Sequence, residues 1–399
     1  MYDRLLKIAL YAATIKILLT PLSGGLSTIF GYIMLLCFFL NPIVNSVQEK
    51  RVSLTALAVI FCVVLSAITS FTFFETEELT SKIISVVSFV AFYWTLSSEH
   101  GKHSAICLKD MFICGYILTA VFLLYTFLDV PFKYTVVNEY GSIAFTMGLG
   151  NPNEGSSYVM VAIMILMFRF VSIESALRKV FIVGLIGTLV YILIKLQSRT
   201  VVFCVLIFLV CGLFFSRRRA GKAVQIAFML VPFAMIFLQI FEISTISGIT
   251  ILGKELNTGR NVIYGTFFRE LRETPYFILL GNLCKYHFSN LHNGVLAIFA
   301  SLGLVGVVLY IKIWLDQFKA AGADDGDRVR NIALFSMLIF VLHSSAEAMS
   351  AVGSLPYGIF MVIIAKIAKG EIEFCCEKEQ TTDPVRFENR LPQKIGGKV

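Results

Sequence analysis

Long hydrophobic runs separated by short polar turns dominate the chain. Each run comes close to the roughly 20 apolar residues that a helix needs to cross about 30 Å of hydrocarbon. The pattern therefore predicts an all-α, polytopic integral membrane protein with about 12 transmembrane helices in residues 1–368. The runs lie at about 5–21, 26–46, 53–74, 80–97, 105–128, 155–173, 179–197, 200–216, 223–242, 292–314, 331–349 and 353–369.

One long polar segment interrupts this pattern. It covers about residues 243–291 and passes directly into the apolar run that follows it. Apolar residues at helical spacing come after Arg260, so this long loop is expected to hold short helices, one of which begins near that arginine. Most of the remaining chain is hydrophobic run and short turn. Any chemistry is therefore expected in this segment and on the residues that the spans bring next to it.

The composition excludes a soluble protein. The chain is 57% hydrophobic and 15% charged, whereas soluble domains are about half apolar and about a quarter charged. The net charge of +8 does not indicate nucleic-acid binding, because the basic residues lie in short loops and in the tail, as they do in membrane proteins. The cysteines show no spacing typical of zinc sites or disulfide frameworks, so neither a metal nor a cofactor is expected.

The basic residues also predict an orientation. Cytoplasmic loops are enriched in Lys and Arg, and the predicted number of spans puts every basic loop on that side. Both termini are then cytoplasmic, and the long polar segment lies outside, in the periplasm if the host is Gram-negative. Residues 369–399 form a polar tail of mixed charge that is expected to be partly disordered. The basic loops contain Arg4, Lys7, Lys50, Arg51, Lys102, Arg178, Lys179, Arg217, Arg218, Arg219, Lys222, Lys319, Arg328 and Arg330.

Arginines on the outer side run against this bias and are candidate binding residues. Arg199 lies in the turn between two runs, where a charge tends to face the protein interior or a water-filled cavity. The alternative for Arg199 is a snorkelling side chain that reaches lipid headgroups. Arg260 would lie near the start of the external helix. Arg269 and Arg272 follow on that helix, where an ion pair such as Arg269 with Glu273 explains them as well as ligand contact does.

His292 is the candidate for proton transfer. It lies where the polar segment meets its membrane helix, and the next residue, Asn293, is suited to cap that helix. Imidazole is the side chain best suited to take up a proton near neutral pH. A lone histidine is more often structural, but external arginines flank this one. His287 is less constrained by its surroundings.

Two further sites on the outer side carry polar residues. Asn151 and Pro152 form a typical helix start, and this leaves Asn153 and Glu154 at an external position where they can contact a polar ligand. His343 and Glu347 are spaced i, i+4 near the outer end of the run at 331–349, so they are expected to share a helix face. An acidic residue inside a span is a functional candidate. The alternative is that Glu347 simply pairs with His343.

Outward-facing arginines with one histidine and no metal cluster suit an anionic, lipid-linked substrate. Guanidinium groups bind phosphate oxygens in pairs and stabilise a departing pyrophosphate. A histidine can accept the proton of an attacking sugar hydroxyl. These arguments alone do not separate group transfer from transport.

Short motifs add a resemblance. They are Ser198–Thr200 at the start of a run, Gly259 with Arg260, Pro275, Gly281, the stretch from Leu291 to Gly306, and Gly148 ahead of Asn151–Asn153. Over about residues 148–358 this pattern resembles the bacterial O-antigen ligase/polymerase superfamily. The resemblance implies a polytopic, GT-C-like glycosyltransferase that inverts the anomeric centre and needs no metal. It further implies that Arg199 and Arg260 bind the pyrophosphate and that His292 acts as the base.

The resemblance also implies the donor and the partners. The donor is an oligosaccharide on undecaprenyl pyrophosphate in the bacterial inner membrane, and a chain-length regulator and a flippase act in the same pathway. A short segment between Arg260 and His292 favours the polymerase, which moves the growing chain onto a new lipid-linked repeat unit. The alternatives are the ligase, which moves the chain onto lipid A–core, and a transporter of lipid-linked oligosaccharide. A transporter would need charges at mid-membrane depth.

Overall fold

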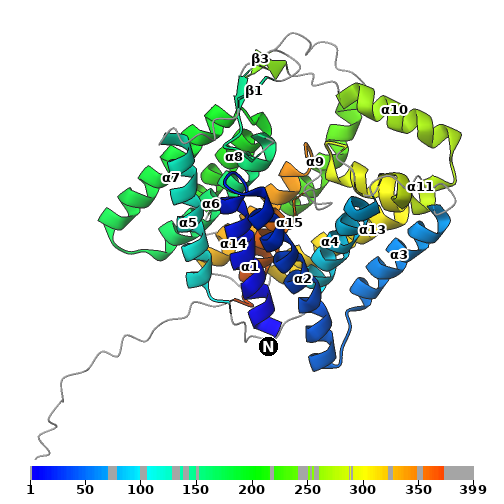
Figure 1. Cartoon of the computed structure of the whole chain (residues 1–399), viewed down its shortest axis with the longest axis horizontal. Helices are drawn as coiled ribbons and strands as arrows, with labels where there is room; N and C mark the ends of the chain where they lie inside the picture. Colours follow the sequence, from blue (N-terminus) through cyan, green and yellow to red (C-terminus); the bar gives the residue numbers. More distant parts are fainter. Residues whose placement is uncertain are drawn as a thin grey trace, which may run out of the picture.

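The computed structural model of the chain is almost entirely helical (Figure 1). It describes residues 2–70, 79–98, 106–127, 135–137, 143–149, 152–215, 220–240, 250–251, 254–255, 260–286, 288, 291–321, 327–347 and 354–372. Most of the predicted polar tail, residues 373–399, lies outside the described residues. The long helices are α1 (Tyr2–Leu19), α2 (Gly24–Glu49), α3 (Leu54–Ser70), α4 (Leu79–Ser97), α5 (Leu108–Phe127), α6 (Pro152–Ser172), α7 (Ala176–Leu196), α8 (Arg199–Phe215), α9 (Lys222–Ile240), α13 (Gly294–Ala321), α14 (Arg328–His343) and α15 (Leu355–Lys369).

Every hydrophobic run predicted from the sequence corresponds to one of these helices, with ends that differ by a few residues. Within the described part of the chain, 5 helices are long and apolar enough to cross a membrane, namely α2, α5, α6, α7 and α13. Several shorter apolar helices accompany them, including α3, α8 and α9. The architecture is that of a multi-pass helical membrane protein, and the figure of about 12 spans stays a prediction.

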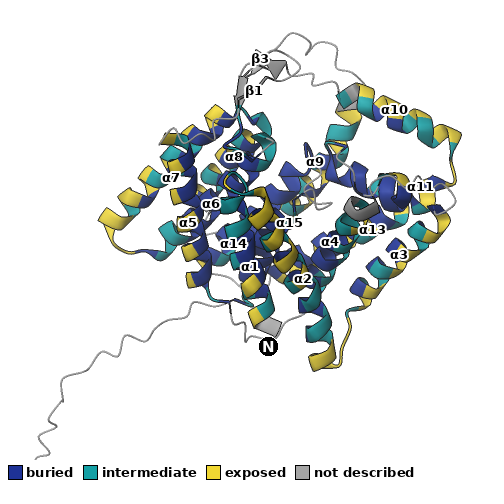
Figure 2. Cartoon of the chain, in the orientation of Figure 1, coloured by how far each residue is buried: buried dark blue, intermediate teal, exposed yellow. Residues whose placement is uncertain are grey.

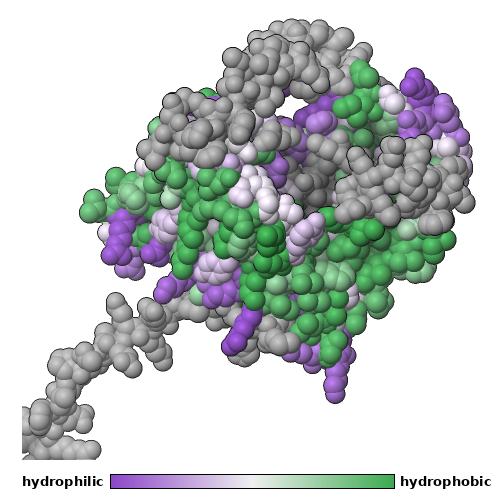
Figure 3. All heavy atoms as spheres, viewed as in Figure 1, coloured by the Kyte–Doolittle hydropathy of each residue, from purple (hydrophilic) through white to green (hydrophobic). Residues whose placement is uncertain are grey.

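The helices are arranged around a buried centre. Most residues of α6, α14 and α15 are buried (Figure 2). Large apolar side chains are exposed instead on α2, α3, α7 and α8, and hydrophobic residues cover wide areas of the face in Figure 3. Exposed apolar surface on this scale is unusual for a soluble monomer and suits contact with lipid chains.

The described part of the long polar segment folds into short helices, as predicted, and into two short strands. They are strands β3 (Thr250–Ile251) and β4 (Lys254–Glu255), and helices α10 (Arg260–Glu273), α11 (Phe277–Leu280) and α12 (Leu283–Tyr286). Strands β1 (Thr135–Val137) and β2 (Ile143–Phe145) form a second antiparallel pair. These two short hairpins are the only departure from an all-α fold among the described residues. The end of the molecule that carries α10 lies away from the N-terminus (Figure 1).

Helix α13 is broken at Gly303, and the polar segment packs into the break. Gly303 has φ +65° and ψ −160°, a backbone conformation reserved for glycine. A Cβ at Gly303 would lie against the carbonyl group of Leu279, and one at Gly281 (φ +70°) would lie against the backbone of Ser301. The Asn282 N–H donates to the Ala300 carbonyl at 2.8 Å. The backbone around Leu279–Asn282 therefore touches that around Ala300–Gly303 directly. This contact packs α11 and α12 against the first half of α13.

Replacing Gly303 with alanine is expected to lower the thermal stability of the detergent-purified protein. The new methyl group has no space, and the backbone strain alone costs about 1–3 kcal/mol. Gly187→Ala in α7 is the matched control, because nothing lies within 4 Å of its Cβ position and alanine favours a helix over glycine by about 1 kcal/mol. Equal melting temperatures for Gly303→Ala and the unaltered protein would contradict the packing described here.

Candidate functional site

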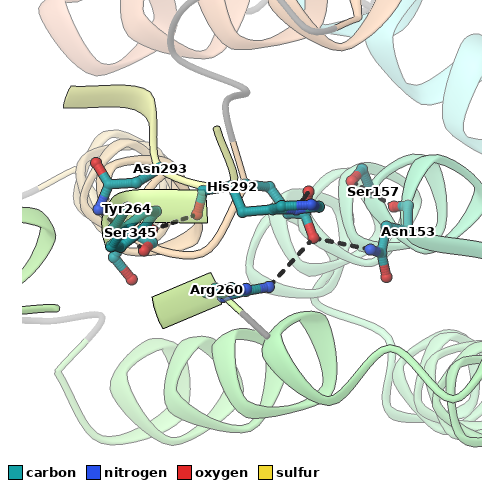
Figure 4. A network of polar contacts seen from close by, with 8 residues as sticks. Asn153, Ser157, Arg260, Tyr264, His292, Asn293 and Ser345 are labelled. Atoms are coloured by element: carbon teal, nitrogen blue, oxygen red, sulfur yellow. Dashed lines mark hydrogen bonds and ion pairs between the residues drawn. The ribbon is translucent and has the colours of Figure 1, made fainter. Parts of the chain in front are cut away.

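The polar residues predicted on the outer side converge on one carboxylate, that of Glu347. Glu347 lies in the turn that follows α14, and its side chain is only 6% exposed. Asn153 comes from the first turn of α6, Arg260 is the first residue of α10, and His292 lies just before α13. Figure 4 shows that the side chains of these three residues point toward one another. Four segments far apart in the sequence thus build one site.

The contacts of Glu347 differ in length. The Asn153 Nδ2 donates to its Oε1 at 2.8 Å. The Arg260 Nη2 lies 3.7 Å from the same oxygen, and the His292 Nδ1 lies 3.6 Å from the other oxygen, Oε2. Both distances are longer than a hydrogen bond. Catalytic contacts of this kind are often long without substrate and shorten when it binds.

The neighbouring Asn293 fixes the start of α13 next to His292. The Asn293 Oδ1 accepts from the Leu296 N–H at 3.0 Å and so caps α13, as predicted. Its Nδ2 donates to the Pro232 carbonyl at 2.9 Å and to the Ser345 carbonyl at 3.2 Å. These bonds tie the start of α13 to α9 and to the turn that carries Glu347. His292 itself has φ +53°, an uncommon backbone conformation for a residue other than glycine, which the surrounding contacts maintain.

The charges around Glu347 keep it ionised. Burial opposes the charged form, but the interaction with His292 and the charge of Arg260, with a smaller effect of His343, hold the pKa of the Glu347 carboxyl below its usual value. Tyr264 lies one turn after Arg260 on α10. Burial raises the pKa of Tyr264 to about 12, so its phenol stays protonated and faces the His292 carbonyl oxygen at 3.4 Å.

The other predicted site residues lie elsewhere or make other contacts. Arg199 begins α8 and is partly buried. Arg269 and Arg272 are exposed on α10, outside this site. The Glu154 Oε1 accepts from the Tyr158 hydroxyl at 2.6 Å, and that hydroxyl lies 2.8 Å from the Ser354 Oγ. His287 lies outside the described residues.

The i, i+4 relation expected for His343 and Glu347 is kept by one backbone hydrogen bond, although the two residues do not share a regular helix. Helix α14 ends at His343, and Glu347 follows in a turn, where its N–H donates to the His343 carbonyl at 3.2 Å. His343 is fully buried, and its Nδ1 lies 3.3 Å from the Tyr357 hydroxyl. The side-chain partners of Glu347 are therefore Asn153, Arg260 and His292, which come from other parts of the chain.

Sequence reasoning missed Tyr264 and Ser345. Tyr264 belongs to the helical pattern that begins at Arg260, and its i+4 spacing from that arginine was a usable signal. Ser345 contributes a backbone carbonyl to Asn293, and a backbone contact of this kind leaves no mark in the sequence.

A second cluster ties α10 to α12. The Glu270 carboxylate accepts from the Lys285 Nζ at 2.7 Å and from the Tyr286 hydroxyl at 2.6 Å. These two hydrogen bonds hold the pKa of Glu270 below its usual value. The cluster fixes the orientation of α10, and α10 carries Arg260 and Tyr264.

The Glu270 cluster predicts a pH dependence. A carboxyl whose pKa is lowered in the folded protein stabilises it above the ordinary glutamate pKa of about 4.3, and this contribution is lost as the pH falls through the lowered value. The amides of α10 are therefore expected to be less protected from hydrogen exchange at acid pH than at neutral pH, after correction for the intrinsic exchange rate at each pH. Glu270→Gln should exchange faster at neutral pH and lose most of this dependence, whereas Glu273→Gln, on an exposed residue, should behave like the unaltered protein. An unchanged exchange rate in Glu270→Gln would refute the tether.

The site as a whole offers a buried carboxylate, one guanidinium and one imidazole that is 32% exposed. In the described ranges no group of three or more His, Cys, Asp or Glu side chains is placed to hold a metal ion. The arrangement suits binding of an anion beside a proton acceptor. No family model, curated protein or solved structure matches the chain.

Proposed function

We propose that the chain is a membrane-embedded glycosyltransferase of the O-antigen polymerase type, GT-C-like, in the bacterial inner membrane with both termini in the cytoplasm. Its donor is a growing glycan on undecaprenyl pyrophosphate, and its acceptor is a new lipid-linked repeat unit. The observation that carries the proposal is the convergence of Arg260, His292 and Asn153 on the buried carboxylate of Glu347. A guanidinium group and an imidazole thus share one carboxylate, which supports the roles proposed below.

His292 acts as the general base in this proposal. Its Nδ1 faces Glu347, so a proton on Nδ1 is stabilised by the carboxylate and the other ring nitrogen, Nε2, is left as the acceptor. A carboxylate behind a histidine fixes the tautomer and stabilises the imidazolium that forms. The acceptor hydroxyl attacks the anomeric carbon of the donor, the bond to the pyrophosphate breaks with inversion, and the hydroxyl proton passes to His292.

Arg260 binds the departing pyrophosphate. A guanidinium group has five N–H donors, and the contact with Glu347 uses only one of its edges. The remaining donors are available for phosphate oxygens, whose charge increases as the bond breaks. Arg199, at the start of α8, is proposed as a second contact to the same lipid-linked group, on the basis of the resemblance and its position at the boundary of the membrane.

The charge distribution favours transfer over transport. Transport requires charged groups at mid-membrane depth, and Lys16, the strongest candidate in the sequence, lies in the last turn of α1. Arg169 likewise lies in the last turn of α6, with its guanidinium 5.0 Å from the centre of the Phe112 ring. The charged groups of the Glu347 site lie at the start of α10, before α13 and after α14.

Deletion of the gene in its own host, with the lipopolysaccharide read as a ladder, tests the proposal. Loss of a polymerase leaves lipopolysaccharide with a single repeat unit, and re-expression restores the ladder. Loss of a ligase removes all O-antigen from lipopolysaccharide but leaves polymerised, lipid-linked chains. Loss of a transporter removes both and leaves single lipid-linked units on the cytoplasmic side. The last two patterns would overturn the proposed function in favour of those alternatives.

A further inference from the structure

A groove between α1 and α2 is separate from the Glu347 site. Its volume is about 530 Å³, within the range of about 300–1,000 Å³ typical of small-molecule sites. Its walls are apolar, formed by Ile8, Ala12 and Ile15 of α1 and by Phe30 and Ile33 of α2. Ile8 and Ile33 are 45% and 38% exposed, so the groove opens on the outer surface of the helical bundle.

The charged residues of the groove lie toward one end. Arg4 and Lys7 belong to the first two turns of α1, whereas Ile15 marks the opposite end of the groove. An α-helix rises about 1.5 Å per residue, so the distance from Arg4 to Ile15 along α1 is about 16 Å. This length matches one leaflet, which is about half of the 30 Å hydrocarbon thickness. The groove thus has the length of one lipid chain and cations where the headgroup would lie.

Two cations lie at this end of the groove. The Lys7 Nζ lies 2.9 Å from the Asp110 Oδ1, which also accepts from the Tyr11 hydroxyl at 2.8 Å. The side chain of Lys7 nevertheless remains 37% exposed, and Arg4 is exposed and makes no ion pair within the described part of the chain. Arg4 and the exposed part of Lys7 can therefore both reach an anionic group at this end.

We propose that this groove binds an anionic phospholipid of the leaflet on the N-terminal side. Arg4 and Lys7 contact the phosphate, since guanidinium and ammonium groups are the usual phosphate ligands, and one acyl chain lies along the apolar walls. If a helix from a second copy or from another membrane protein packed into the groove, Arg4 and Lys7 would lie within the apolar interface. Placing charged side chains in such an interface is unfavourable. The cytoplasmic leaflet, where the basic loops place this end, is the one rich in anionic lipid.

The test uses the full chain in nanodiscs of equal parts phosphatidylglycerol and phosphatidylethanolamine. After mild delipidation, native mass spectrometry counts the lipids that stay bound. The unaltered protein is expected to retain phosphatidylglycerol in preference to phosphatidylethanolamine. Arg4→Gln should weaken retention about fivefold, as expected for the loss of one cation near an anionic headgroup. Ile33→Trp, or Ile8→Trp if that variant is not produced, should fill the groove and abolish retention.

Two control variants separate the groove from general membrane contact. Arg51→Gln removes an exposed cation beyond α2, and Ile29→Trp adds the same bulk at an exposed position of α2 outside the groove. Both should retain lipid like the unaltered protein. Equal retention of the two lipids, or equal loss in the groove and control variants, would overturn the proposal. A doubled mass that Ile33→Trp converts to the monomer would identify a second copy as the occupant instead.

Discussion

Replacing His292 with alanine is expected to abolish long glycan chains while the protein still inserts into the membrane. A general base contributes about 10²–10⁴-fold to the rate, and the other imidazole near Glu347, that of His343, is fully buried. The loss should appear in the rate constant and leave binding of the donor largely intact, because Arg260 remains. The measurement is chain extension in membranes that contain the host's own lipid-linked repeat unit, together with the lipopolysaccharide ladder.

Arg272→Ala is the control for that experiment. Arg272 lies on the exposed side of α10, so its loss changes the charge of the same segment without touching the site, and the ladder should stay normal. Arg260→Ala should instead weaken donor binding, which raises the KM. A normal ladder from His292→Ala would remove the histidine from the mechanism and leave the arginine roles untouched.

The helices were predictable from the sequence because they depend on local pattern. Every hydrophobic run forms a helix, α6 begins at Pro152, and Asn293 caps α13 through its own side chain. Each of these features needs only residues within one or two turns. Arg260 and His292 were also identified in this way, since each lies at the boundary between a polar segment and a helix.

The position of Glu347 was not predictable because long-range backbone bonds decide it. The Ser344 carbonyl accepts from the Gly294 N–H at 2.8 Å, and the Ser345 carbonyl accepts from Asn293. These bonds join the turn after α14 to the start of α13 and so place Glu347 beside His292. The break at Gly303 has the same origin, since the sequence shows a glycine in an apolar run but not the backbone of Leu279 against it.

The pattern of charges in the sequence also did not show which of the outer arginines belongs to the site. Arg199, Arg260 and Arg269 all lie on the predicted outer side, and each was a candidate for binding. The structure separates two of them, because Arg260 faces a buried carboxylate and is 15% exposed, whereas Arg269 is exposed on α10. Only the three-dimensional structure shows which arginine lies beside a buried carboxylate.

Replacing Glu347 with glutamine is expected to give a folded protein with activity lowered about 10³-fold or more. Glutamine keeps the size of the side chain and an oxygen that accepts from Asn153. Its amide N–H₂, however, would face His292 Nδ1 as a donor and favour the tautomer that carries its proton on Nε2, which is the nitrogen needed as the base. A wrong tautomer of this kind costs about 10⁴-fold in the serine protease triad. The same assay of chain extension measures the loss.

The kinetic constants of the folded variants separate this positioning role from a merely structural one. Loss of positioning should lower kcat in Glu347→Gln and leave the KM for the donor largely unchanged, whereas a structural defect would lower the amount of folded protein. Glu347→Asp keeps the charge and should restore part of the activity.

Glu347→Ala removes both the charge and the hydrogen bond to Asn153. The free energy of unfolding of this variant should fall by about 3 kcal/mol. This value is at the low end for a broken buried pair because His292 is partly exposed. If Glu347→Gln keeps normal chain extension, the carboxylate does not position the histidine. The contacts of Glu347 with Arg260, His292 and Asn153 would then serve only to hold together the four segments that carry these residues.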